Sequence, residues 1–140
     1  MFKQILAAVD LDHREHAEKI LRVAVDTANT YSAGLLVMSV IDAVQPVVSQ
    51  QLPEGYEKMA MKRTRQDLAR LLKNAELVEG EVGISARFGD IYREILAQAE
   101  KSAVDLIVIG SHQPHASDFL LGSNSSRVVR HSPCSVFVVR

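Results

Sequence analysis

Two glycines near the end of the chain mark the residues best suited to chemistry. Gly110 ends an apolar run, and Gly122 opens the polar stretch Ser-Asn-Ser-Ser at residues 123–126, just before a short predicted helix. Such a stretch leaves backbone N–H groups accessible at the positive end of a helix dipole. A plain helix cap needs one hydroxyl or amide, not four. The composite predicts a phosphate site, whereas either glycine alone is more typical of a turn with positive φ.

A second candidate group is the carboxylate of Asp10, which follows the first apolar run at residues 5–9. At the end of a strand it can accept hydrogen bonds from an adenine base or a ribose. It can equally serve as a turn or capping residue for the helix that follows. Asp12, three residues before Glu15, fits the capping role better. This assignment leaves Asp10 for a ligand.

Other reactive side chains form no pattern specific to a metal or a catalytic site. His112 and His115 lie near Asp118 in one loop, without further ligands at a fixed spacing. His13 and His16 lie three apart on the first predicted helix. We expect all four histidines to be ordinary exposed residues, and we predict no resident metal site built by side chains.

The sequence favours binding over catalysis. A P-loop lysine motif, a nucleophile elbow and an H-E-x-x-H pair are all absent from it. No Lys or Arg lies between Ser111 and Gly122. Phosphate charge would then be balanced by backbone N–H groups, the helix dipole and a bound Mg²⁺ ion. We therefore expect at most a weak ATPase.

Composition indicates one domain, residues 1–140, of ordinary globular character, with 47% hydrophobic and 24% charged residues. The net charge of −1 gives no general attraction to nucleic acid or to anionic membranes. The apolar runs are too short to span a bilayer. The single cysteine, Cys134, suits a reducing compartment and is expected to be a small core residue. The N-terminus shows no signal-peptide pattern, so a cytoplasmic location is expected.

Strand and helix patterns alternate along the chain. Short apolar runs predict strands at residues 5–9, 35–41, 82–88, 106–109 and 135–139. One-sided apolar spacing predicts helices between them, the first ending at Gly34, the third capped by Gly89 and Asp90, and the last starting after Gly122. This alternation predicts a mostly parallel five-stranded sheet with helices on both faces, a three-layer Rossmann-like α/β fold. With strand order 3-2-1-4-5, ligands bind where the order reverses, between strands one and four.

These motifs resemble those of the universal stress protein family over essentially the whole chain. The family pattern is glycine, two residues, glycine, nine residues, then glycine with serine or threonine. Here Gly110 and the pair at 122–123 match it, while Gln113 replaces the second glycine and the spacer is eight residues long. Ala8 stands where many members have proline. The opening run to Asp10 and the closing run at 128–139 are also similar to the family. The loop resembles a nucleotide-binding bacterial subgroup.

The resemblance implies binding of ATP, or of ADP or AMP, in a stress-response module that signals through nucleotide occupancy. It also implies a homodimer formed through the last strand, Ser135 to Arg140. In the implied site Asp10 meets the adenine or ribose, Val40 flanks the base, and further groups border the ribose and phosphates. Those further groups are Gly110, His112, Gln113, Gly122, Ser123, Asn124 and Ser125.

Three alternatives stay open at this point. A phosphoacceptor receiver domain has a similar length and alternation, with Asp10 and Asp12 as its acidic pair, although no lysine follows the fifth strand. A slow ATPase of the same fold is the second. A module that has lost its ligand and works through dimer contacts is the third.

Overall fold

A computed structural model of the chain describes residues 1–43, 52–76, 82–111 and 122–140. Within these ranges five strands form one sheet, all parallel, in the order β3-β2-β1-β4-β5. The elements are β1 (Gln4–Ala8), α1 (Arg14–Tyr31), β2 (Gly34–Asp42), α3 (Tyr56–Asn74), β3 (Gly83–Gly89), α4 (Ile91–Lys101), β4 (Leu106–Gly110), α5 (Ser123–His131) and β5 (Ser135–Val139). The predicted fold class and strand order are confirmed. Receiver domains have the order 2-1-3-4-5, so this fold disagrees with the receiver alternative.

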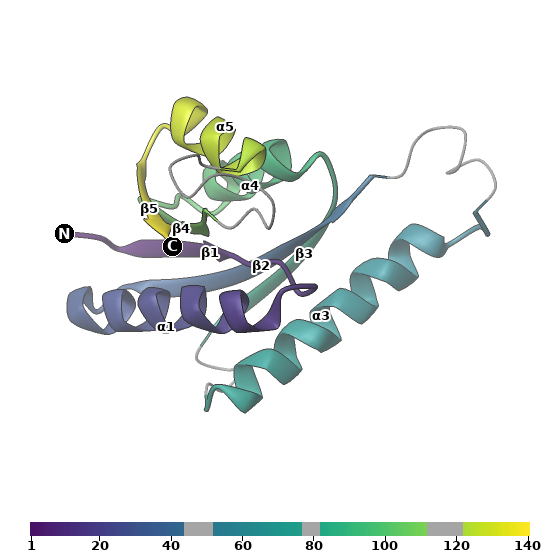
Figure 1. Cartoon of the computed structure of the whole chain (residues 1–140), viewed down its shortest axis with the longest axis horizontal. Coiled ribbons are helices and arrows are strands. Elements are labelled where there is room, and N and C mark those ends of the chain that lie inside the picture. Colours follow the sequence, from purple (N-terminus) through teal and green to yellow (C-terminus); the bar gives the residue numbers. More distant parts are fainter. Residues whose placement is uncertain (44–51, 77–81, 112–121) are drawn as a thin grey trace.

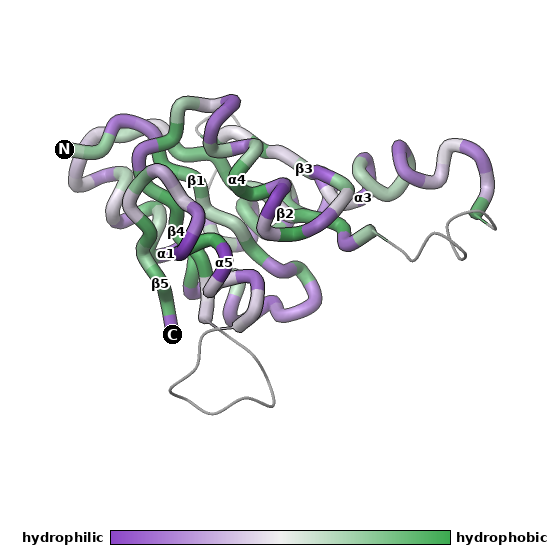
Figure 2. Tube along the Cα trace, turned by 90° about the horizontal axis from the view of Figure 1, so that it is seen from above, coloured by the Kyte–Doolittle hydropathy of each residue, from purple (hydrophilic) through white to green (hydrophobic). Residues whose placement is uncertain are grey.

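Helices cover both faces of the sheet. Figure 1 shows α1 and α3 on one face and α4 and α5 on the other. Two apolar cores follow, one under α1 and α3 and one under α4 and α5. The central strands β1 and β4 contribute to both cores, with Ile5, Leu6, Ile107 and Val108 fully buried. Figure 2 shows the same apolar strands inside the molecule, with the start of α3 reaching outward.

Two predicted helix boundaries are wrong in detail. Gly34 does not end α1, because Ser32 adopts the left-handed conformation there (φ 52°) and Gly34 already belongs to β2. Asp12 does not cap the helix, since its N-cap residue is His13 and no side chain caps it. At α4 the residue Asp90 is the N-cap by position, but its carboxylate pairs with Arg93 and makes no capping bond. Local sequence preference locates these ends within two or three residues.

Among the described residues, no helix combines the length and the apolar character needed to cross a membrane.

Gly110 is required at the end of β4 for close packing. Its φ lies outside the left-handed region, so the turn interpretation is wrong for this residue. A Cβ built on Gly110 would overlap the imidazole of His16 and lie 3.0 Å from Cδ1 of Ile20. His16 is therefore not the exposed residue expected from sequence, because its ring lies half-buried against the β4 backbone. The small residue lets α1 approach the end of β4.

Gly110→Ala should lower the free energy of unfolding by about 2 kcal/mol, because the added methyl overpacks the contact with His16. His16→Ala in the same chain should recover part of that loss, which a double-mutant cycle from urea unfolding would measure. Strict additivity of the two substitutions would contradict the contact.

Asp105 fastens the start of β1 to the start of β4. Its two carboxylate oxygens accept the N–H of Lys3 at 2.9 and 3.1 Å, and one of them also accepts the N–H of Gln4 at 3.1 Å. The amide of Asp105 in turn donates to the Gln4 carbonyl at 3.0 Å. The hydrogen bonds from the amides of Lys3 and Gln4 lower the pKa of this carboxyl. The ionised form is therefore the one that the fold stabilises.

Because the pKa of Asp105 is lower in the folded state, its contribution is present above the ordinary carboxyl pKa and is lost as the pH falls through the folded value. Asp105→Asn should cost about 1 kcal/mol at pH 7, the value of an ordinary hydrogen bond, since solvent screens this site. Thermal unfolding from pH 7 to pH 2 should show the difference from the parent shrinking at acid pH. The control is Asp26→Asn on the exposed face of α1, which should show no such trend. A difference that does not depend on pH would contradict the role of the charge.

Candidate functional site

The candidate site lies at the carboxyl edge of the sheet, where the strand order reverses. β1 and β4 pair in parallel, with Ile5 opposite Leu106 and Ala7 opposite Val108. The chain leaves β1 toward α1 on one face and leaves β4 toward α5 on the other. Diverging connections of this kind open a crevice at the edge of an α/β sheet, where ligands bind. Asp10 and the start of α5 belong to the two connections.

The carboxylate of Asp10 takes part in the turn that leads into α1. Its Oδ1 accepts the amide of Asp12 at 2.9 Å, and its Oδ2 lies 3.0 Å from Nδ1 of His13. The expectation that Asp12 serves the helix start and leaves Asp10 uncommitted is therefore wrong. The Asp10 side chain is still 64% exposed. Since each carboxylate oxygen has two acceptor sites, both can accept one further hydrogen bond.

The amides at the start of α5 form the donor side of the site. The first backbone hydrogen bond of α5 runs from the amide of Ser126 to the Gly122 carbonyl at 2.8 Å. The amides of residues 123–125 precede it, so they have no partner within the helix. In the described part of the chain no carbonyl or side chain accepts from them. Three neighbouring N–H groups at a helix start suit an anion.

Ser125 has a different role from the one expected. Its hydroxyl donates to the carbonyl of Gly110, the last residue of β4. A serine has one O–H donor, so this hydroxyl cannot also donate to a phosphate. The bond instead fixes the α5 start beside the β4 end. Ser123 is exposed and Asn124 is half-buried.

Apolar side chains near the carboxyl ends of β1 and β2 form a floor on the α4 and α5 side of the sheet. Ala8 of β1 and Val40 of β2 are half-buried and pack on the core under α4 and α5, together with Ile91 and Tyr92 of α4. Val40 pairs with Arg87 near the ends of β2 and β3. Apolar side chains of this kind can pack against one face of a base.

His112 and Gln113, two other predicted site residues, fall outside the described residues.

The start of α4 adds side chains that the sequence reasoning did not single out. The guanidinium carbon of Arg127 lies 5.3 Å from the centroid of the Tyr92 ring, and that of Arg93 lies 5.7 Å from it. His131 also faces this ring, at 6.1 Å between centroids. Tyr92 could have been noticed in the sequence, because it is an aromatic residue in the first turn of a helix that begins at the carboxyl edge of the sheet. The residues that contact Tyr92 from α5 are identified only by the packing of α4 on α5.

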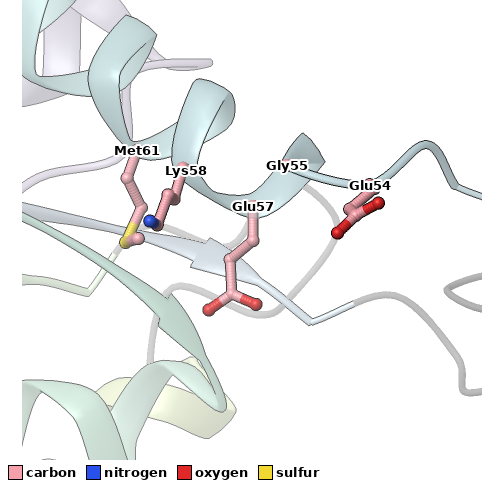
Figure 3. Close-up of a pocket in the computed structure, with 5 residues that line it drawn as sticks. All are labelled: Glu54, Gly55, Glu57, Lys58 and Met61. Carbon is pink, nitrogen blue, oxygen red and sulfur yellow. The ribbon is translucent and has the colours of Figure 1, made fainter.

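Two surface hollows lie outside this crevice. One of about 480 Å³ is lined by Glu54, Gly55, Glu57, Lys58 and Met61. Figure 3 shows that all five come from the start of α3 and the turn before it, and no other described element lines the hollow. The second, of about 400 Å³, lies on the first turns of α1 beside Asp10 and is lined by His13, Arg14, Glu15, His16 and Lys19. Neither hollow brings together donors from two elements.

The described residues contain no group of three or more His, Cys, Asp or Glu side chains that could hold a metal ion. Oxygen ligands at the crevice come from Asp10 and the α5 start, a set that fits Mg²⁺ only when phosphate oxygens complete it. Cys134, expected in the core, is only half-buried and packs against the core under α4 and α5, and its Sγ lies 3.4 Å from the Ser132 hydroxyl.

Comparison with known proteins agrees with this architecture. A universal stress protein of Staphylococcus haemolyticus is 33% identical over 99% of this chain and 85% of its own length. The structure of universal stress protein UspA from Lactobacillus plantarum has a TM-score of 0.77 at 24% identity and covers 99% of this chain and 97% of that one. The universal stress protein of Archaeoglobus fulgidus in complex with dAMP has a TM-score of 0.64 at 17% identity, covering 99% and 98%.

The family profile described as "Universal stress protein family" matches residues 1–140, the whole chain. Together with the relative at 33% identity, this match establishes the resemblance drawn from the glycine motif and the closing strand. The chain belongs to the universal stress protein family.

Proposed function

We propose that this protein binds an adenine nucleotide at the crevice between β1 and β4 and acts as a cytoplasmic stress-response module whose signal is nucleotide occupancy. The observation that carries the proposal is the row of amides at residues 123–125, which the Ser125–Gly110 bond fixes beside the end of β4. A family member of the same fold in complex with dAMP supports the choice of an adenine nucleotide.

Each part of the nucleotide has a matching group in this proposal. The base lies on the floor that contains Val40, and Asp10 accepts hydrogen bonds from the base or ribose. Gly110, His112 and Gln113 border the ribose and first phosphate. The outer phosphates meet Gly122 and the amides of residues 123–125, with the side chains of Ser123 and Asn124. Ser125 contributes through its amide, since its hydroxyl is bonded to Gly110.

ATP with Mg²⁺ is the proposed ligand, with ADP or AMP as the alternatives. Backbone amides and a helix dipole favour negative charge without neutralising it fully. A Mg²⁺ ion bound mainly to the phosphate oxygens would balance the remaining negative charge. Donors of this kind hold a ground-state nucleotide and supply no general base. A turnover above roughly one per second, which is near the low end of enzyme rates, would instead favour the ATPase alternative.

We also propose a homodimer formed through β5, an edge strand of the sheet. Val136 and Val138 pack on the core under α4 and α5, so Phe137 points to the opposite face. There it is 45% exposed, unlike Val139 on the same face, which is 5% exposed. Antiparallel pairing with a second copy would cover both the exposed ring and the open edge.

Mg-ATP at 100 times its dissociation constant should stabilise the protein by about 2.7 kcal/mol, because only the folded state binds it. Differential scanning fluorimetry would record the shift, and mass spectrometry of small molecules released from fresh protein would identify a resident nucleotide. Gly122→Val should abolish the shift, because its side chain would occupy the phosphate position.

The backbone at Gly122 has a φ of −59° and a ψ of 156°, which valine adopts without strain. The substitution should therefore leave the nucleotide-free protein folded, apart from a weaker helix cap. Gly122→Ala serves as the smaller matched change and should retain part of the shift. No stabilisation of the parent protein at millimolar nucleotide would refute the binding proposal.

Phe137→Asp should convert the dimer to a monomer, because a charge at the centre of the pairing strand opposes edge-to-edge association. Sedimentation velocity at about 100 µM would measure this, a concentration well above the Kd of a specific dimer. Val129→Asp is the matched control, since Val129 on α5 is 44% exposed and lies off the edge strand. A parent protein that sediments as a monomer, or a Phe137→Asp variant that stays dimeric, would contradict pairing through β5.

A further inference from the structure

Arg127 connects the first turns of α5 to the start of α4 through the face of one ring. Its guanidinium carbon lies 5.3 Å from the Tyr92 centroid. A cation over an aromatic face at this distance is attracted by the ring quadrupole. The contact holds a long and otherwise exposed side chain on the side of α5 that faces α4.

The Tyr92 ring is itself held by its neighbour Arg93. The Nε of Arg93 donates to the Tyr92 hydroxyl at 3.2 Å and lies 3.3 Å from Oδ2 of Asp90. Asp90 therefore balances the charge of Arg93, which also stacks on the ring at 5.7 Å. The Tyr92 hydroxyl bond and the Asp90 charge both raise the pKa of Arg93. This group fixes the ring on which Arg127 lies.

The charge of Arg127 is not balanced in the same way. Across the described parts of the chain no carboxylate lies within 4.0 Å of its guanidinium. Stacking uses the face of the guanidinium, so the N–H donors around its rim stay available for an anion. Arg127 thus combines a position on the Tyr92 ring with a charge that no carboxylate of the described residues pairs with.

Its position in α5 directs this charge toward the helix start. Arg127 follows Ser123 by four residues, so the two lie on one side of α5 in successive turns. The Cα–Cβ bonds of a helix tilt toward its N-terminus, so the Arg127 side chain leaves α5 in the direction of the turn that carries residues 123–125. Between Ser111 and Gly122 the sequence offers no other Lys or Arg.

We propose that Arg127, positioned by Tyr92, makes the site prefer nucleotides with outer phosphates over nucleoside monophosphates. The inference depends on the nucleotide binding proposed above and assigns the selectivity within it. Arg127 is the specificity-determining residue, because its cation contacts the charge that distinguishes ATP from AMP. Tyr92 is a positioning residue, since it acts through Arg127.

Calorimetric titration of the purified protein with ATP and with AMP would test this selectivity. Arg127→Gln should weaken ATP binding roughly tenfold, the effect of losing one hydrogen bond to a charged group, and leave AMP binding within about twofold. Arg127→Lys should keep most of the preference, because the charge remains. Tyr92→Leu should lower the ATP preference by roughly threefold, about what a partly exposed cation–π contact contributes, and Tyr92→Phe should retain it.

Arg130→Gln is the matched control, since Arg130 is exposed on the same helix and has no contact with the Tyr92 ring. This substitution should change the affinity for neither ATP nor AMP. If Arg127→Gln weakens the binding of ATP and AMP equally, or weakens the binding of neither nucleotide, the selectivity inference is overturned while the nucleotide proposal stands. If the parent protein binds neither nucleotide, both are overturned. Unfolding curves without nucleotide confirm that each variant is folded.

Discussion

The parallel pairing of β1 with β4 is the constraint on which the rest of the molecule depends. It joins residues from opposite ends of the chain, and both strands are buried between two helix layers. Burial on both faces requires continuous apolar strands, which residues 5–7 and 106–109 supply. β2 lies beside β1 on one side and β5 lies beside β4 on the other. Right-handed connections to these strands therefore place α1 and α5 on opposite faces of the sheet. Asp10 and the start of α5 belong to these two connections, at the edge where α/β sheets bind ligands.

The ends of these two strands are also fastened by specific contacts. At the amino ends the Asp105 carboxylate accepts the amides of Lys3 and Gln4. At the carboxyl ends His16 packs on Gly110, and Ser125 donates to the Gly110 carbonyl. The residue that begins the family motif is therefore also a packing residue. Its small size serves the approach of α1, and its carbonyl positions the amides that are proposed to hold phosphate.

The sequence was sufficient to predict the strands, because buried parallel strands are recognisable as apolar runs. The alternation of apolar and polar residues at 82–88 also predicted that β3 lies near a sheet edge. The strand order, which the structure confirms, was an assumption that apolar runs alone do not supply. It was insufficient for features set by contacts between distant segments. Ser32 ends α1 in place of Gly34, because the Gly34 amide donates to the Lys3 carbonyl and Gly34 already belongs to β2. The Ser125 hydroxyl and the His16 ring are directed by Gly110, which no local pattern reveals. The glycine-serine motif thus predicted a helix start after β4, but not that the Ser125 hydroxyl is bonded to the Gly110 carbonyl there.

The central claim is that backbone amides at the start of α5 hold the phosphates of an adenine nucleotide. Titration of ¹⁵N-labelled protein with Mg-ATP, followed by amide chemical shifts, tests it most directly. The account predicts that the largest changes occur at Ser123, Asn124 and Ser125, with smaller ones beside Asp10. Changes confined to α3 or β5, or none at all at saturating nucleotide, would contradict it.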